Sequence, residues 1–139
     1  MRILAIDLGA KRVGLALAEA ESRFAYPLTT LARGARAKLF EDILRIVGEH
    51  DVGEIVVGLP LALDGSETLG SRQARNFVDS LKRRTALPVL AVNEALTSEA
   101  AKDDLIAAGR KGARLTAVLD QQAAVHILQT YFSQARTTS

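Results

Sequence analysis

The fold is decided by an apolar stretch near the N-terminus, Ile3-Leu4-Ala5-Ile6-Asp7-Leu8-Gly9. The stretch is short, rich in aliphatic residues and ends at a glycine, which predicts a central β-strand covered on both faces. Asp7 stands out in it, because an ionised carboxylate without a partner is strongly unfavourable at such a place. A cation, several N–H donors or a metal ion must compensate this charge. A structural aspartate paired with arginine or backbone donors is the plainest of these alternatives.

The patterns that follow predict a single domain over residues 1–139. Strands are expected at 13–18, 26–31, 54–60 and 88–92, and helices at 36–49, about 70–85, from Thr97 to Gly109 and about 116–134. The order β-β-β-α-β-α-β-α-α predicts an antiparallel meander of three strands followed by parallel strands. We therefore expect an α/β fold with a five-stranded mixed sheet and helices on both faces.

The composition excludes several classes of protein. There is no cysteine, so disulfides and thiolate zinc sites are ruled out. No apolar run approaches the length of a membrane span, and no separate signal-type segment precedes the first strand, so we expect a cytoplasmic protein. The net charge is only +2, but 13 of the 18 basic residues are arginine, whose planar fork suits phosphate oxygens.

Two basic segments are candidates for contact with nucleic acid. Lys11 and Arg12 follow the first strand, and the glycine-bearing loop at 109–114 carries Arg110, Lys111 and Arg114 without a hydrophobic anchor. Such a loop can lie along a phosphate backbone. Solvated surface is the simpler interpretation of either segment.

Two further acids resemble Asp7 in their placement. Glu94 ends the buried strand pattern at 88–92, and ligands of α/β sheets gather at the carboxyl ends of strands. Asp120 falls on the apolar stripe of the last helix, near its expected N-terminus, where the helix dipole favours a negative charge. Taken singly, Glu94 could be a solvated turn residue and Asp120 a simple acid near a helix end.

Together, the three acids predict a metal site at one end of the sheet. Clusters of carboxylate oxygens select Mg²⁺ or Mn²⁺ over softer metals. Two such ions, about 3.5–4 Å apart, activate water and stabilise the leaving oxygen in phosphodiester cleavage. The histidines, His50 and His126, do not fit a ligand pattern with these acids.

The motifs resemble the YqgF/RuvX family over nearly the whole chain. They are Ile6-Asp7-Leu8-Gly9, Arg12-Val13-Gly14, Val56-Val57-Gly58-Leu59-Pro60-Leu61, Asp64-Gly65, Asn93-Glu94-Ala95-Leu96-Thr97-Ser98 and Asp120-Gln121-Gln122-Ala123-Ala124 with Ile127-Leu128-Gln129. These proteins are similar to Holliday junction resolvases and have the RNase H fold. The resemblance implies a metal-dependent nuclease of the cytoplasm that matures the 5′ end of pre-16S ribosomal RNA during ribosome biogenesis. It places the family's three acids on Asp7, Glu94 and Asp120.

One motif departs from the family pattern. The family usually has Asp-Glu-Arg where this chain has Asn93-Glu94-Ala95, so the central glutamate is kept and the flanking acid and arginine are lost. Among the other cations, Arg12, Arg72 and Arg114 are candidates to replace that arginine.

Three alternative functions stay open at this point. A resolvase of branched DNA would be expected to act as a dimer, because a four-way junction has two-fold symmetry, whereas trimming of an RNA end requires only a monomer. A catalytically weak module that binds RNA or the ribosome would show salt-dependent binding without turnover. An actin-like ATPase shares the opening Asp-x-Gly hairpin, but it needs two such domains.

Overall fold

The computed structural model describes the backbone of residues 1–9, 11–62, 64–94 and 112–138, and the side chains of the last segment from residue 118 to 134. The elements are β1 (Arg2–Leu8), β2 (Arg12–Glu19), β3 (Ala25–Ala32), α1 (Arg36–Glu49), β4 (Val52–Leu59), α2 (Leu69–Lys82), β5 (Val89–Asn93) and α4 (Gly112–Thr138). Among these described helices, none has the length and apolar character needed to cross a membrane.

The five strands form one mixed sheet in the order β3-β2-β1-β4-β5. The pairs β1–β2 and β2–β3 are antiparallel, and the pairs β1–β4 and β4–β5 are parallel. This arrangement confirms the predicted meander and places β1 at the centre of the sheet. Because β1, β4 and β5 run in the same direction, Asp7 and Glu94 lie at the same end of the sheet, at the carboxyl ends of these strands.

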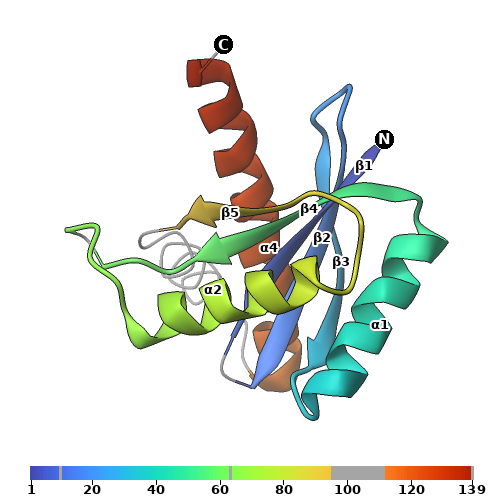
Figure 1. Cartoon of the computed structure of the whole chain (residues 1–139), viewed down its shortest axis with the longest axis vertical. Helices are drawn as coiled ribbons and strands as arrows, with labels where there is room; N and C mark the ends of the chain where they lie inside the picture. Colours follow the sequence, from blue (N-terminus) through green and yellow to red (C-terminus); the bar gives the residue numbers. More distant parts are fainter. Residues whose placement is uncertain (10, 63, 95–111, 139) are drawn as a thin grey trace.

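The two faces of the sheet differ in the size of their side chains. Along β2, the large residues Val13, Leu15 and Leu17 alternate with Gly14, Ala16 and Ala18. The large side chains pack with α1 and α2 in one core, and the small ones pack with α4 in a second core. Figure 1 shows α2 in front of the strands and α4 crossing behind them. Small residues therefore mark the face where a helix approaches the strands closely.

Gly14 is the point of closest approach between α4 and the sheet. A Cβ atom at Gly14 would lie 1.9 Å from the carbonyl oxygen of Asp120, a distance that no packing tolerates. In the β1–β2 ladder, Gly14 is the direct partner of Asp7. The absence of one side chain thus lets the helix bring Asp120 beside the strand that carries Asp7.

Some boundaries differ from the sequence-based expectation. Strand β4 begins at Val52 and includes Gly53, where the Met1 side chain occupies the space that a Cβ would take. Helix α4 begins at Gly112 instead of about 116 and continues to Thr138 instead of 134. The helix expected from Thr97 to Gly109 lies outside the described residues.

Replacement of Gly14 by alanine tests the close approach of α4. We expect Gly14→Ala to lower the free energy of unfolding by about 3 kcal/mol, the upper end of the usual range for overpacked sites, since backbone and not a flexible side chain is in the way. Urea unfolding followed by circular dichroism measures the change.

The matched control is Gly48→Ala on α1, where an added Cβ meets no atom within 4 Å. There alanine should stabilise the helix by about 0.5–1 kcal/mol, because glycine loses more conformational entropy on folding. Equal effects of the two substitutions would contradict the packing inferred for Gly14.

Candidate active site

Asp7 lies near the end of the central strand, with its side chain on the α4 face of the sheet. Burial, and then the negative charges of Asp120 and Glu94, together raise its pKa from 3.8 to about 7. Among the described residues, no cation forms an ion pair with this carboxylate. The compensating cation that the sequence called for is thus not supplied by a described side chain, which leaves the other predicted options, N–H donors or a metal ion.

Glu94 follows β5 directly and is held in place by the neighbouring strand. Its backbone N–H donates a hydrogen bond of 2.8 Å to the carbonyl oxygen of Leu59. Only 6% of the residue is exposed, and both carboxylate oxygens are buried. A Cβ at Gly58 would lie 3.2 Å from the Glu94 Cγ and 2.6 Å from the Ile127 Cδ1, so this glycine makes room for both side chains. Glu94 is therefore a buried acid and not a solvated turn residue.

Asp120 reaches the site from α4, and its surroundings correct one expectation. Because the helix begins at Gly112, Asp120 lies beyond its first turn, which contains no acid. The helix dipole acts only within the first turn, so it does not stabilise this carboxylate. Arg12 does so instead, with its Nε 3.0 Å from Oδ2 of Asp120. Burial still raises the pKa of Asp120, and the Arg12 guanidinium works against that rise.

The three acids are coupled electrostatically but do not form a closed metal cage. Within the described part of the chain, no three acidic or histidine side chains are gathered closely enough to hold a metal ion. The carboxylate of Asp120 is turned toward Arg12, as the ion pair shows. The donor set nevertheless fits a hard divalent cation, since every donor is a carboxylate oxygen and the repulsion felt by Asp7 is of the kind that such a cation relieves.

Cations surround the same end of the sheet. The hairpin turn between β1 and β2 is closed by a hydrogen bond of 2.9 Å from Gly9 N–H to the Arg12 carbonyl, and it exposes Lys11 and Arg12. The end of β3 adds Arg33, whose backbone N–H donates to the Lys11 carbonyl at 3.0 Å. The Arg33 guanidinium donates to the Gly9 carbonyl at 2.8 Å. A positively charged rim is thus built beside Asp7.

Sequence reasoning missed Arg33 and proposed Arg72 instead. Arg33 stands in Arg33-Gly34-Ala35-Arg36, which combines two arginines with a glycine as the 109–114 segment does, and it could have been selected by that signal. Arg72 lies on α2, is exposed, and has Glu67 as its acidic neighbour at 3.8 Å. No described contact joins Arg72 to the three acids. Arg110 and Lys111 lie outside the described residues, and so does the side chain of Arg114.

Two resolvases solved in complex with four-way DNA junctions are among the structures that superpose on this chain. Thermus thermophilus RuvC in complex with a Holliday junction superposes with a TM-score of 0.63 and 16% identity, over 99% of this chain and 96% of that chain. A fowlpox virus resolvase, also in complex with Holliday junction DNA, gives 0.60 and 11% identity, over 97% and 99% of the two chains. At these identities the likeness defines the fold, the RNase H-like fold of the resolvases.

Sequence comparison then narrows this class to a family. Residues 1–134 match the family model RuvX, described as Holliday junction resolvase, and the chain belongs to this family. Relatives named "Putative pre-16S rRNA nuclease" include one from Maridesulfovibrio salexigens, 46% identical over 97% of this chain and 100% of the relative. Another, from Nitratidesulfovibrio vulgaris, is 47% identical over 96% and 94%. The chain is therefore a nuclease by class, a hydrolase of phosphodiester bonds.

The raised pKa of Asp7 predicts how stability depends on pH. The folded state holds this proton up to about pH 7, whereas the unfolded chain releases it near 3.8. Between these values the folded state binds more protons, so stability falls as the pH rises and then levels off above pH 7. We expect Asp7→Asn to be more stable than the wild type at pH 8 in the presence of EDTA.

The difference between the unfolding midpoints of the two proteins should grow from pH 4 to pH 7 and stay constant above. Urea titrations at unit pH steps measure it. Asp79→Asn, which changes an exposed aspartate of α2, serves as the control and should show no such trend. If Asp7→Asn were less stable than the wild type at pH 8, the inference that the charged Asp7 carboxylate destabilises the folded state would be wrong.

Proposed function

We propose that the chain is a metal-dependent nuclease that trims the 5′ end of pre-16S ribosomal RNA in the cytoplasm. The observation that carries the proposal is the largely buried Asp7 carboxylate, whose pKa is raised to about 7 beside two further acids at a cation-rimmed end of the sheet. A carboxylate whose pKa is raised this strongly by burial and by neighbouring acids is typical of functional sites.

Asp7, Glu94 and Asp120 are the residues that would hold the divalent ions. When bound, Mg²⁺ or Mn²⁺ supplies an activated water and stabilises charge on the leaving oxygen. Asp7 is fixed by its strand, and Glu94 by its backbone hydrogen bond to Leu59. Asp120 is the adjustable member, since its carboxylate is partly exposed and would exchange its ion pair with Arg12 for a metal ion.

The cationic rim positions the nucleic acid. Lys11 and Arg12 are exposed on the hairpin turn, and Arg33 lies beside them with its guanidinium donating to Gly9. Arginine presents five N–H donors in a fixed fork, so one hydrogen bond to the protein leaves donors for phosphate oxygens. The nucleic-acid strand would therefore cross the end of the sheet above the β1–β2 hairpin turn, with one phosphate directed at Asp7. Arg110, Lys111 and Arg114 are proposed to extend this contact.

The choice of RNA is supported by the relatives. Proteins with the pre-16S rRNA nuclease name match this chain along almost its whole length at 37–47% identity, including one from Nitrosomonas europaea at 37%. The ribosome or its precursor is then the proposed partner. Branched DNA is the second candidate, favoured by the resolvase description of the family model. That activity would require two copies of the chain, one for each strand that is cut.

A cleavage panel tests the proposed reaction. We expect Mn²⁺- and Mg²⁺-dependent cleavage of single-stranded RNA carrying the precursor 5′ end, and weaker or no cleavage of duplex DNA and of a four-way junction. Asp7→Asn should lower the rate by more than the roughly 10–100-fold that the loss of an outer-shell partner of a metal typically costs. Single-turnover assays with labelled substrates measure the rates.

Asp79→Asn is again the control and should retain the full rate. Preferential cutting of the junction would favour the second candidate. Undiminished cleavage by Asp7→Asn, with the variant shown to be folded, would remove the central assignment. Salt-dependent RNA binding without turnover in either metal would instead leave a binding module.

A further inference from the structure

A pocket opens at the same end of the sheet, but on the face opposite α4. It has a volume of about 220 Å³ and lies between the end of β1, the connection from β3 to α1, and helix α2. Leu8, the residue after Asp7, forms part of its wall. The pocket and the candidate active site are thus separated by one strand end, and a flexible chain passing over the Gly9 turn would reach both.

The charged wall of the pocket carries two arginines with neutral partners. Arg33 donates to the Gly9 carbonyl at 2.8 Å, and Arg36 donates to Oγ of Ser80 at 2.7 Å and to the Asn76 carbonyl at 3.4 Å. Among the described residues, no carboxylate pairs with either guanidinium. Both side chains are therefore held in place while their positive charge stays uncompensated, which is the state of a site prepared for an anion.

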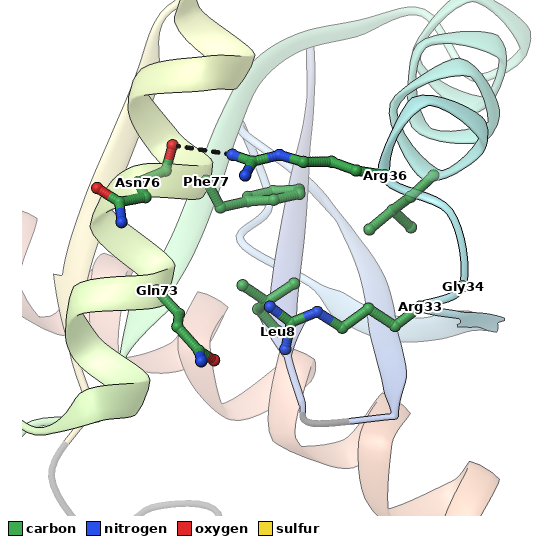
Figure 2. A pocket seen from close by; sticks show the side chains of 8 residues that line it. Leu8, Arg33, Gly34, Arg36, Gln73, Asn76 and Phe77 are labelled. Atoms are coloured by element: carbon green, nitrogen blue, oxygen red, sulfur yellow. Dashed lines mark hydrogen bonds between the residues drawn. The ribbon is translucent and has the colours of Figure 1, made fainter.

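The rest of the wall is apolar or carries amide groups. Leu8, Leu39 and Phe77 supply the apolar part, and Gln73 and Asn76 stand on α2. Figure 2 shows Arg33 extending across to Leu8 and Gln73 reaching toward them from α2, while Arg36 bridges to the α2 backbone above the Phe77 ring. An apolar wall, an amide able to read a base edge, and two arginines able to donate hydrogen bonds to phosphate are the groups that recognise a nucleotide.

The size of the pocket limits the ligand. Pockets for drug-sized molecules are roughly 300–1,000 Å³, and this pocket is smaller, so it can hold at most one nucleotide unit. The α2 wall is also fixed, because Thr68 caps the helix by accepting from Ser71 N–H at 3.1 Å and donates to the Pro60 carbonyl at 2.7 Å. A fixed wall is the property expected of a specificity pocket.

We propose that this pocket binds one nucleotide of the substrate strand next to the cleaved bond, with its base against Leu8 and Phe77 and its phosphate at Arg33 and Arg36. The inference rests on the proposed nuclease function and adds a site that selects where the strand is cut. The nucleic-acid strand bends around the Gly9 turn, so one phosphate faces Asp7 while the neighbouring base enters the pocket.

The test measures binding without cleavage. Calorimetry in EDTA, with the Asp7→Asn protein, compares adenosine 5′-monophosphate, inorganic phosphate and adenosine. We expect the nucleotide to bind more tightly than either phosphate or adenosine alone. Arg36→Gln should weaken the binding of the nucleotide about tenfold through the loss of a charge-assisted hydrogen bond.

Gln73→Glu places a negative charge at the exposed edge of the pocket, with little structural cost, and should also abolish most of the nucleotide binding. Arg45→Gln, on the exposed side of α1, is the matched control and should change nothing.

Further measurements distinguish the proposed nucleotide pocket from the proposed nuclease function. A labelled single-stranded RNA should lose affinity in Gln73→Glu in parallel with the mononucleotide. Loss of mononucleotide binding with unchanged RNA affinity would assign the pocket to a free nucleotide and overturn the strand assignment. Equal binding of the nucleotide by all variants, or none by the parent protein, would overturn the pocket itself. Failure of the cleavage panel alone would leave the nucleotide-binding result standing.

Discussion

The contact between the backbone of α4 and Gly14 is the constraint on which the site depends. A helix cannot approach a strand so closely unless the strand lacks a side chain at that point, and here the absent atom would stand 1.9 Å from the Asp120 carbonyl. The partner of Gly14 across the ladder is Asp7. One glycine therefore sets the separation between an acid on the sheet and an acid on the helix. Gly58 plays the same part for Glu94 and Ile127 on the other side of β1.

Burial and repulsion at this point oppose the folding of the chain. Asp7 is charged at neutral pH only at a cost, since it is largely buried and feels two other acids. Arg12 relieves Asp120 but is not paired with Asp7. The favourable packing of the surrounding core offsets this unfavourable free energy, as is common where a functional site is strained. The cations of the rim lie close by, with Arg12 paired to Asp120 and Arg33 hydrogen-bonded to the Gly9 carbonyl.

Much of this arrangement could be predicted from residue types. The β-strand patterns predicted the antiparallel meander and the parallel strands of the sheet, and a charge inside an apolar strand marked Asp7 at once. Other features could not be predicted, because they depend on contacts between distant segments. A glycine in a strand signals a close approach without naming its partner, so the link from Gly14 to Asp120 was not visible. The start of α4 at Gly112 extends a helix into a glycine- and arginine-containing segment that resembles a loop, and this misplaced Asp120 near a helix end. Arg33 escaped notice because its role lies in a hydrogen bond to a turn 24 residues away.

The division of the interior into two cores has a consequence for how the protein can change. Large side chains of the sheet meet α1 and α2 on one face, whereas α4 on the other face meets the small residues of β2 together with Ile3, Val56 and Val92. Substitutions in the first core alter how firmly the chain folds and leave the acids where they are. Substitutions in the second core move the helix that carries Asp120, and with it the chemistry. Robustness and reactivity are thus assigned to opposite sides of a single sheet, so each can be adjusted by evolution, or by an engineer, with little disturbance of the other.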